Sequence, residues 1–327
     1  MGKKLVVITG PTAAGKTGLG ILLAQAISGE VVSADSMQVY RRMDIGTAKP
    51  TDEEMQGVPH HMINIADPDE AYSVARYVAE ASACADDILA RGKTPILLGG
   101  TGLYIESLLL GRDFAEQGSG RPGRSPLRME LLERYDRLGG EILWRELQEI
   151  DPEAAGRLHP NDKKRIVRAI EVYQLTGQTI TAHNAATQAV PPRYEAVKIA
   201  LTARDRADLY RRIDRRVDLM VEQGLVEEVT HLLETGLSPN STAMQAIGYK
   251  EMAQAVLGEV SLETAIETIK QESRRYAKRQ LSWTRRDPEF NWIEWSDAPD
   301  LMHALQVSTE FCRRAGIMDL GQAANPT

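Results

Sequence analysis

Short apolar runs alternate with helix-compatible stretches over the first third of the chain, and this rhythm predicts a parallel sheet. Residues 5–9, 30–33 and 95–98 have the length and apolar character of buried strands. Residues 17–28 and 74–91 lie between them and have the composition and punctuation of helices. In such a βαβ arrangement the crossovers are right-handed, and ligands bind beyond the carboxyl ends of the strands.

The pattern changes in the middle of the chain. Residues 115–126 are rich in Gly, Pro and Ser and indicate a loop. From residue 127 to about 175 the apolar positions recur with helical spacing, at Leu131, Leu138, Leu143 and Leu147. Asn161 or Asp162 is a predicted cap for a helix that ends before Gly177. Residues 196–201 then indicate a strand, as if the sheet resumes.

A long helix is predicted after this strand, from about residue 205 to residue 223. Leu209, Ile213, Val217 and Met220 fall on one face of it and are expected to pack on the core. Arg212 and Arg216 are four residues apart and are therefore neighbours beside that face. Spacing alone favours a pair of surface arginines.

One motif bears directly on chemistry. Residues 10–17 read Gly-Pro-Thr-Ala-Ala-Gly-Lys-Thr, a complete G-x-x-x-x-G-K-[ST] loop between a strand and a helix. Its backbone N–H groups and the helix N-terminus can hold a diphosphate or polyphosphate. The predicted phosphate-binding residues are Gly10, Pro11, Thr12, Ala13, Ala14, Gly15, Lys16 and Thr17, of which Thr17 would reach a bound Mg²⁺.

The loop and the strand pattern together predict an α/β fold. It has a P-loop NTPase-like parallel sheet core with helices on both faces and an inserted helical domain. The expected divisions are a split core at 1–112 and 196–315, an insert at 113–195 and a disordered tail at 316–327.

The strand ends do not fit an ordinary nucleotide hydrolase or kinase, which would place a metal-binding Asp after a later strand. Residues 95–98 lead instead into Gly-Gly-Thr at residues 99–101. The carboxylate that ends a strand near the loop is Asp35. From the residues alone, Asp35 could be a metal ligand, a general base or a helix cap.

Charge is distributed unevenly in this chain of 327 residues, whose formal net charge is −7. Residues 268–286 hold seven Lys and Arg residues against a single acid, Glu272, and residues 163–168 hold a second basic cluster. Such local patches set the field that a nucleic-acid backbone experiences, although each could also be a solvated helix face.

Other features narrow the class of protein. Cys84 and Cys312 provide neither a disulfide framework nor zinc-ligand spacing, and no apolar run reaches the length of a membrane span. His60 and His61 have no third ligand nearby, so we expect a packed, hydrogen-bonded role for them. We expect a cytoplasmic protein that acts as a monomer with no membrane partner.

Several motifs, in order along the chain, carry a resemblance to a known family. They are Gly-Pro-Thr-Ala-Ala-Gly-Lys-Thr (10–17), Ser-Ala-Asp-Ser-Met-Gln-Val-Tyr (33–40), Met-Asp-Ile-Gly-Thr-Ala-Lys-Pro (43–50), Val-Pro-His-His (58–61), Gly-Gly-Thr-Gly-Leu-Tyr (99–104), His-Pro-Asn-Asp (159–162), Gln-Ala-Ile-Gly-Tyr-Lys-Glu (245–251) and Arg-Tyr-Ala-Lys-Arg-Gln-Leu-Ser-Trp (275–283). With these motifs the sequence resembles the tRNA dimethylallyltransferases, also called tRNA isopentenyltransferases.

The resemblance implies transfer of a dimethylallyl group from dimethylallyl diphosphate to the N6 amine of the tRNA adenosine on the 3′ side of the anticodon. The phosphate loop would then hold the leaving diphosphate rather than ATP. The resemblance implies catalytic roles for Asp35 as the proton acceptor and for Thr101, Lys16 and Arg216. It leaves open whether Arg216 or Arg212 contacts the diphosphate.

The resemblance also implies contacts with the tRNA anticodon stem-loop, whose target base must be turned out of its stack. The implied contact residues are Asp35, Ser36, Met37, Gln38, Thr101, Lys163, Lys164, Arg165, Gln245, Ala246, Ile247, Gly248, Tyr249, Lys250, Arg275, Tyr276, Lys278, Arg279, Gln280 and Ser282. The segment 115–130 departs from the family pattern and is given no RNA contact.

Three other functions agree less well with the sequence. A prenyltransferase acting on free adenine nucleotides would need neither the helical insert nor the basic segment. A small-molecule or nucleotide kinase would need an Arg-rich lid and a base pocket, which the sequence does not show. A non-enzymatic RNA-binding module would not require a complete phosphate loop beside Asp35.

Overall fold

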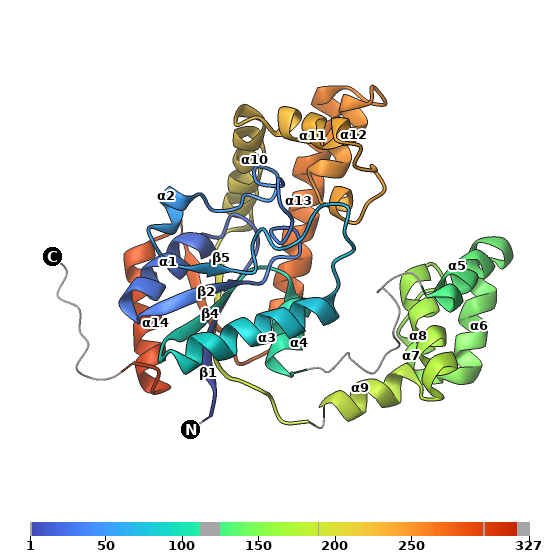
Figure 1. Ribbon diagram of the computed structural model, residues 1–327, viewed down its shortest axis with the longest axis horizontal. Coiled ribbons are helices and arrows are strands. Elements are labelled where there is room, and N and C mark those ends of the chain that lie inside the picture. The colour runs from blue at the N-terminus through green and yellow to red at the C-terminus, as the bar shows by residue number, and fades with distance from the viewer. Residues whose placement is uncertain (1, 112–124, 189, 297, 319–327) are drawn as a thin grey trace. The chain divides into compact units, whose positions relative to one another are not determined.

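The computed structural model describes residues 2–111, 125–188, 190–296 and 298–318, which belong to two compact units (Figure 1). The first unit contains Met1–Gly111 and Arg193–Thr327, and the second is Arg112–Pro192. Most of the predicted loop at 115–126 and most of the predicted tail at 316–327 lie outside the described residues.

A sheet of six parallel strands in the order β3-β2-β4-β1-β5-β6 forms the centre of the first unit. The strands are β1 (Lys4–Thr9), β2 (Gly29–Ser33), β3 (His60–His61), β4 (Thr94–Leu98), β5 (Glu195–Ala203) and β6 (Asn291–Trp295). Strand β5 follows the inserted unit in sequence and pairs with β1, so the sheet does resume as the sequence predicts.

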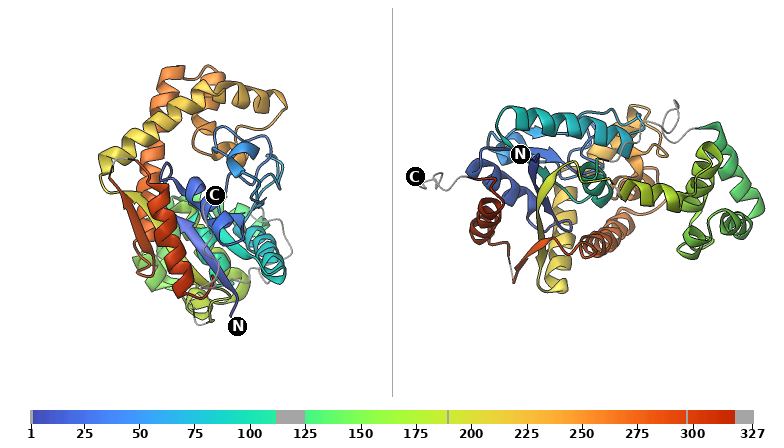
Figure 2. Two further views of the ribbon diagram at one scale, coloured as in Figure 1. Left: turned by 90° about the vertical axis from the view of Figure 1, so that its left-hand side faces the viewer. Right: turned by 90° about the horizontal axis from the view of Figure 1, so that it is seen from below.

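Helices cover both faces of this sheet, which confirms the predicted α/β class (Figures 1 and 2). On one face lie α1 (Lys16–Ala26) and α14 (Leu301–Arg314), and on the other α3 (Val74–Ala90) and α4 (Gly102–Leu109). The remaining helices of the unit are α2 (Asp52–Met55), α10 (Arg206–Glu222), α11 (Leu225–Glu234), the 3₁₀ turn η1 (Ala243–Gln245), α12 (Tyr249–Val256) and α13 (Leu262–Thr284).

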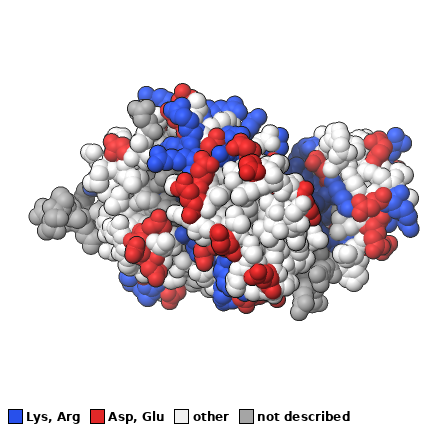
Figure 3. Space-filling model, turned by 90° about the horizontal axis from the view of Figure 1, so that it is seen from above, with Lys and Arg blue, Asp and Glu red and all other residues white. Residues whose placement is uncertain are grey.

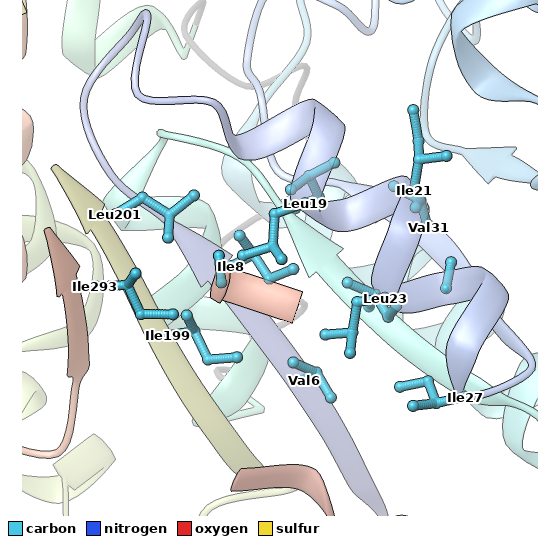
Figure 4. Packing of buried hydrophobic residues seen from close by; sticks show 14 of the residues in the cluster. Val6, Ile8, Leu19, Ile21, Leu23, Ile27, Val31, Ile199, Leu201 and Ile293 are labelled. Atoms are coloured by element: carbon cyan, nitrogen blue, oxygen red, sulfur yellow. The ribbon is translucent and has the colours of Figure 1, made fainter. Parts of the chain in front are cut away.

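The core beneath α1 is built from alternate residues of the strands (Figure 4). Ile8 of β1 and Ile199 of β5 lie on the face of the sheet that α1 covers. Leu19 and Leu23 of α1 belong to the same cluster, and all four side chains are fully buried. Because a fully buried Leu or Ile contributes roughly 2 kcal/mol, this layer fixes the helix that follows the phosphate loop against the sheet.

Local signals set several helix ends. The Arg76 backbone N–H donates to Ser73 Oγ at 3.2 Å, so Ser73 caps α3. Helix α1 ends at Ala26, earlier than the predicted Ser28, because Ser28 takes a left-handed φ of 53°. Gly29 opens β2, where a Cβ would lie 2.9 Å from the Thr94 carbonyl oxygen of the neighbouring strand.

The second unit, as far as it is described, consists of helices. They are α5 (Pro126–Leu138), α6 (Gly140–Ile150), α7 (Pro152–Gly156), α8 (Lys163–Thr176) and α9 (Ile180–Gln188). Leu131, Leu143 and Leu147 are buried in its core, as their spacing predicts. Leu138 is the exception: it is the last residue of α5 and is 41 % exposed, so its assignment to the apolar face was wrong.

The sequence analysis named no element after the basic segment, whereas β6 and α14 complete the sheet and cover it. Among the described residues, no helix is both long and apolar enough to span a bilayer.

Candidate active site

Three loops that follow neighbouring strands meet at the carboxyl edge of the sheet. They are the phosphate loop after β1, the loop that begins at Asp35 after β2, and the Gly-Gly-Thr turn after β4. The Thr101 backbone N–H donates to the Ala34 carbonyl at 3.0 Å and so joins the last two. A Cβ on Gly99 would lie 2.3 Å from that same carbonyl oxygen, so this close approach requires glycine. The structure therefore brings together the three strand ends that the sequence singled out.

Strands β5 and β6 contact the phosphate loop. Trp295 Nε1 of β6 donates to the Ala14 carbonyl at 3.1 Å. Gly10 has a φ of 144°, and a Cβ there would lie 2.2 Å from the Leu201 carbonyl oxygen of β5. Gly15 caps α1 in the left-handed conformation, with φ at 84°. The unsatisfied N–H groups of the first turn of α1 are thereby left at the cleft, as an anion site requires.

A cleft of about 720 Å³ opens at these loops. All its lining residues belong to the first unit. Most of them come from the phosphate loop, Asp35 to Gln38, the loop from Asp44 to Thr51, helix α10, Gln245 to Gly248, and α13. This volume suits a substrate of drug or nucleotide size.

Two cations, Lys16 and Arg216, dominate the electrostatics of the cleft. Burial, and then the charge of Arg216, lowers the pKa of Lys16 to about 8, against an opposing effect of Asp35. Burial also lowers the pKa of Arg216, again opposed by Asp35. Arg216 Nε is buried and has no hydrogen-bond partner among the described residues. Leaving a charged donor buried without a partner costs more than about 1–3 kcal/mol of stability. An anion bound beside Lys16 and Arg216 would remove this cost, so the two cations form a candidate anion site.

Arg212 lies one turn before Arg216 on α10 but does not line the cleft. Its Nη1 is buried without a hydrogen-bond partner in the described part of the chain, and burial lowers its pKa against the effect of Asp208. Of the two arginines that spacing could not separate, Arg216 is the one beside Lys16. Leu209, Ile213 and Val217 are buried as predicted, whereas Met220 lines the cleft and is only half-buried.

Asp35 caps a turn through one of its two carboxylate oxygens. Its Oδ1 accepts the backbone N–H groups of Met37 at 2.9 Å and of Gln38 at 3.4 Å, which is a turn-capping arrangement. No hydrogen bond to Oδ2 is found within the described residues, so this oxygen remains able to accept a proton. Thr101 Oγ1 accepts the Ser36 N–H at 3.0 Å and lies 3.4 Å from Ser36 Oγ, which fixes the segment that carries Asp35.

Helix α13 closes another side of the cleft with Tyr276, Arg279 and Gln280. Burial and the nearby Asp35 charge raise the pKa of Tyr276 to about 12, while hydrogen bonding with Thr101 and Gln280 acts in the opposite direction. The Arg279 guanidinium lies 5.5 Å from the Tyr276 ring centroid, a cation–π contact. Gln280 is buried, and its amide makes hydrogen bonds within the protein.

Glu228 of α11 binds the loop from Asp44 to Thr51, which lines the cleft. This residue was not predicted from the sequence. Its carboxylate accepts the backbone N–H groups of Asp44 and Ile45, each at 2.9 Å, and of Gly46 at 3.2 Å. It also accepts the Tyr249 hydroxyl at 2.5 Å. A Cβ on Gly46 would lie 2.4 Å from the Tyr249 ring, so the glycine in Met-Asp-Ile-Gly is the one available signal for this close contact.

The predicted RNA-contact segment from Gln245 to Lys250 divides into two parts. Gln245, Ala246, Ile247 and Gly248 line the cleft. Tyr249 is fully buried with its hydroxyl bound to Glu228, so in this conformation its side chain supports the cleft from behind. Lys250 is exposed.

The basic segment on α13 is partly neutralised by acids that are distant in sequence. Lys270 pairs with Asp218 at 2.8 Å, and Arg274 pairs with Asp214 of α10. Arg275 pairs with Glu272 on its own helix. Basic and acidic side chains accordingly interleave on the face seen in Figure 3. Side chains that stay exposed, without an ion pair among the described residues, include Lys278 and Arg279, and Ser282 is also exposed.

The predicted RNA contacts of the second unit also differ among themselves. Lys163 Nζ pairs with Asp136 at 2.6 Å and lies 5.6 Å from the Tyr135 ring centroid. Lys164 and Arg165 are exposed on the first turn of α8.

The two adjacent histidines have hydrogen-bonded positions, as the sequence analysis expects. His60 Nδ1 contacts the Val58 carbonyl at 2.9 Å, and His61 Nε2 contacts the Glu30 carboxylate at 2.8 Å. In the ranges that the structure describes, no three His, Cys, Asp or Glu side chains gather in a way that could hold a metal ion.

Comparison with protein families gives two overlapping matches. The family model described as IPP transferase matches residues 38–287, and the one described as Isopentenyl transferase matches residues 3–66. The chain is 47 % identical over 296 residues to the tRNA dimethylallyltransferase of Thermoanaerobacter sp. (strain X514), covering 90 % of this chain and 92 % of the relative. It is 48 % identical over 294 residues to the enzyme of that name from Carboxydothermus hydrogenoformans, with 90 % and 93 % covered.

Two solved structures are similar in fold. The full-length tRNA isopentenylpyrophosphate transferase of Bacillus halodurans is 42 % identical with a TM-score of 0.70, covering 96 % of this chain and 98 % of that one. A eukaryotic dimethylallyltransferase acting on tRNA is 31 % identical with a TM-score of 0.81, covering 99 % of this chain and 82 % of that one.

Proposed function

Since this chain belongs to the IPP transferase family of tRNA dimethylallyltransferases, we propose that it transfers a dimethylallyl group from dimethylallyl diphosphate to the N6 amine of the adenosine on the 3′ side of the tRNA anticodon. The products are N6-isopentenyladenosine in tRNA and free diphosphate.

The observation that carries this proposal is the pair of buried cations at the phosphate loop. Lys16 and Arg216 lie close enough for each charge to disfavour the other, and Arg216 Nε has no partner in the described part of the protein. A diphosphate would relieve both costs at once. As the bond between carbon and the diphosphate oxygen breaks, negative charge grows on that oxygen, and fixed donors of this kind each lower such a barrier by roughly 3 kcal/mol.

Thr17 fits the Mg²⁺ that this chemistry implies. Its side chain lies in the first turn of α1 and lines the cleft beside Lys16. Mg²⁺ is commonly held by one or two protein oxygens together with substrate phosphates and water rather than by a full protein cage, which matches this setting. When bound, the ion would neutralise charge on the diphosphate.

Asp35 is the proposed acceptor of the proton that N6 loses. The N6 lone pair attacks the allylic carbon, and the electrons of the carbon–oxygen bond leave with the diphosphate. The nitrogen becomes cationic as it attacks, so a carboxylate oxygen is a sufficient proton acceptor. Asp35 Oδ2 is available for this, since Oδ1 is occupied by the N–H groups of Met37 and Gln38.

The acceptor adenosine must leave its stack to reach Asp35, which costs a few kcal/mol in a single-stranded loop. The proposed contacts to it are Ser36 to Gln38, Thr101 and the cleft residues Gln245 to Gly248. Exposed cations on both units, including Lys278, Lys164 and Arg165, are proposed to contact the phosphates of the anticodon stem-loop. We propose that the protein acts as a monomer in the cytoplasm.

The acceptor is tested with two transcripts of one tRNA, with adenosine or guanosine on the 3′ side of the anticodon. Nuclease digestion and mass spectrometry are expected to find the prenyl group on that adenosine and nowhere in the guanosine transcript. Equal turnover of free adenosine monophosphate would instead identify a prenyltransferase of free nucleotides.

The lowered pKa of Lys16 predicts a pH dependence of diphosphate binding. An anion binds the protonated amine better, so affinity is highest below the pKa of about 8 and is lost as the pH rises through it. Titration calorimetry with inorganic diphosphate should show affinity falling by up to about tenfold per pH unit above 8. Lys16→Met is the control, because it retains only the titration of the ligand. Parallel curves for the two proteins would contradict the assignment.

Lys278 is predicted to contact a tRNA phosphate. Lys278→Ala should weaken tRNA binding and reduce the slope of log K against log salt by about 0.7, the value for one contact to a single strand. Lys270→Ala is the matched control on the same helix, since Lys270 is held by Asp218 and Glu267. Filter binding across a salt series measures both, and identical slopes for Lys278→Ala and the wild type would make Lys278 a solvated surface residue.

A further inference from the structure

Helix α13 reaches the phosphate loop through one buried side chain, Gln280. Its Oε1 accepts the Thr12 backbone N–H at 3.0 Å. Its Nε2 donates to the Gly100 carbonyl at 3.1 Å. Gln280 is only 7 % exposed, and both ends of its amide are thus satisfied by two different substrate-facing loops.

The Gly-Gly-Thr-Gly turn is shaped to receive this helix. A Cβ on Gly100 would lie 2.0 Å from Gln280 Nε2, and a Cβ on Gly102 would lie 2.3 Å from the indole of Trp283. A side chain at Gly100 would displace the Gln280 amide, and one at Gly102 would collide with the Trp283 ring. The two glycines therefore permit the close contact of the turn with α13.

The same helix carries the side chains proposed to meet tRNA. Lys278 and Arg279 are exposed, and they lie in sequence between the buried residues Ala277 and Gln280. One turn before Gln280, Tyr276 faces Thr101 and the charge of Asp35. A shift of α13 on RNA binding would therefore change the hydrogen bonds that Gln280 makes with Thr12 and Gly100.

We propose that Gln280 is a positioning residue that couples tRNA binding on α13 to the grip of the phosphate loop on the diphosphate. The inference rests on the proposed function. With tRNA bound, α13 is held against the turn, and Gln280 fixes Thr12 so that the rest of the loop presents its N–H groups to the diphosphate. Because such coupling is reciprocal, diphosphate also tightens tRNA binding by the same factor.

Calorimetry with inorganic diphosphate, with and without saturating unmodified tRNA, measures the coupling as a ratio of two dissociation constants. In the wild type tRNA should tighten diphosphate binding by about tenfold, within the usual range of coupling between sites. Gln280→Met keeps the length of the side chain and removes its hydrogen bonds to Thr12 and Gly100, so the ratio of the two dissociation constants should fall close to one. Gln271→Met makes the same change at an exposed position of α13 and should keep the wild-type ratio.

Hydrogen exchange on the wild-type protein gives a test that does not depend on the folding of a variant. Adding tRNA alone should slow exchange in the phosphate-loop peptide that contains Thr12. A wild-type ratio of one, an unchanged ratio in folded Gln280→Met, or unchanged exchange at this peptide would overturn the inference. If wild-type protein transfers the prenyl group normally in these cases, only the coupling fails; if it transfers none, the proposed function fails.

Discussion

Replacing Asp35 with asparagine is expected to lower prenyl transfer at saturating substrates by about 10²- to 10⁴-fold, the usual contribution of a general base. Asparagine keeps an oxygen that can accept the N–H groups of Met37 and Gln38, so the turn should persist. The variant lacks the carboxylate oxygen that receives the proton from N6. Binding of tRNA should remain nearly unchanged, because Asp35 contributes no positive charge to the RNA surface.

Single-turnover kinetics with labelled donor and filter binding of tRNA together check this expectation. Asp35→Ala should lose a similar amount of turnover, and it additionally removes the turn cap. Asp52→Asn is the control, since Asp52 is exposed on α2 and does not line the cleft. Near-normal turnover in Asp35→Asn would show that another group accepts the proton.

Arg216→Ala is expected to lower kcat/KM for dimethylallyl diphosphate by about 10²- to 10³-fold, as when one donor to a developing oxyanion is lost. Arg212→Ala, four residues earlier on the same helix, should cost less than about tenfold because Arg212 lies outside the cleft lining. Arg216→Lys should recover only part of the loss, since an ammonium cannot reproduce the guanidinium fork. Competition by inorganic diphosphate gives a second reading of the same contact.

The ranking of the two arginines is the decisive result. A larger loss in Arg212→Ala than in Arg216→Ala would assign the diphosphate to the other arginine and would require α10 to move on binding. The removal of Arg216 should also raise the pKa of Lys16, because the neighbouring positive charge is one cause of its lowered value.

The sequence predicted those parts of the site that follow from local patterns. A complete phosphate loop, a strand that ends at Asp35 and a glycine-rich turn each require only a few consecutive residues. Parallel pairing then places them at one edge, and Thr101 N–H bonding to Ala34 shows how closely they meet. The α/β class followed from the same alternation of strands and helices.

Contacts between distant segments were beyond the reach of those patterns. Arg212 and Arg216 are neighbours on α10, and only the folded structure shows that Arg216 lines the cleft and Arg212 does not. Lys270 and Arg274 belong to the basic segment at 268–286, but they pair with Asp218 and Asp214 of α10, which are distant in sequence.

Glu228, which binds the loop from Asp44 to Thr51, also could not be predicted from any local sequence pattern. The three backbone N–H groups that donate to its carboxylate lie more than 180 residues away in the chain, and no spacing rule links them to it.

The proposed function requires the phosphate loop to hold a leaving diphosphate rather than a nucleotide that donates phosphate. The most direct measurement incubates the protein with Mg²⁺, unmodified tRNA and dimethylallyl diphosphate labelled in its carbon chain, with γ-labelled ATP as the alternative donor in a parallel reaction. We expect label in tRNA from dimethylallyl diphosphate, one diphosphate released for each group transferred, and no label from ATP. Absence of carbon label in tRNA, or transfer of phosphate from ATP, would contradict it.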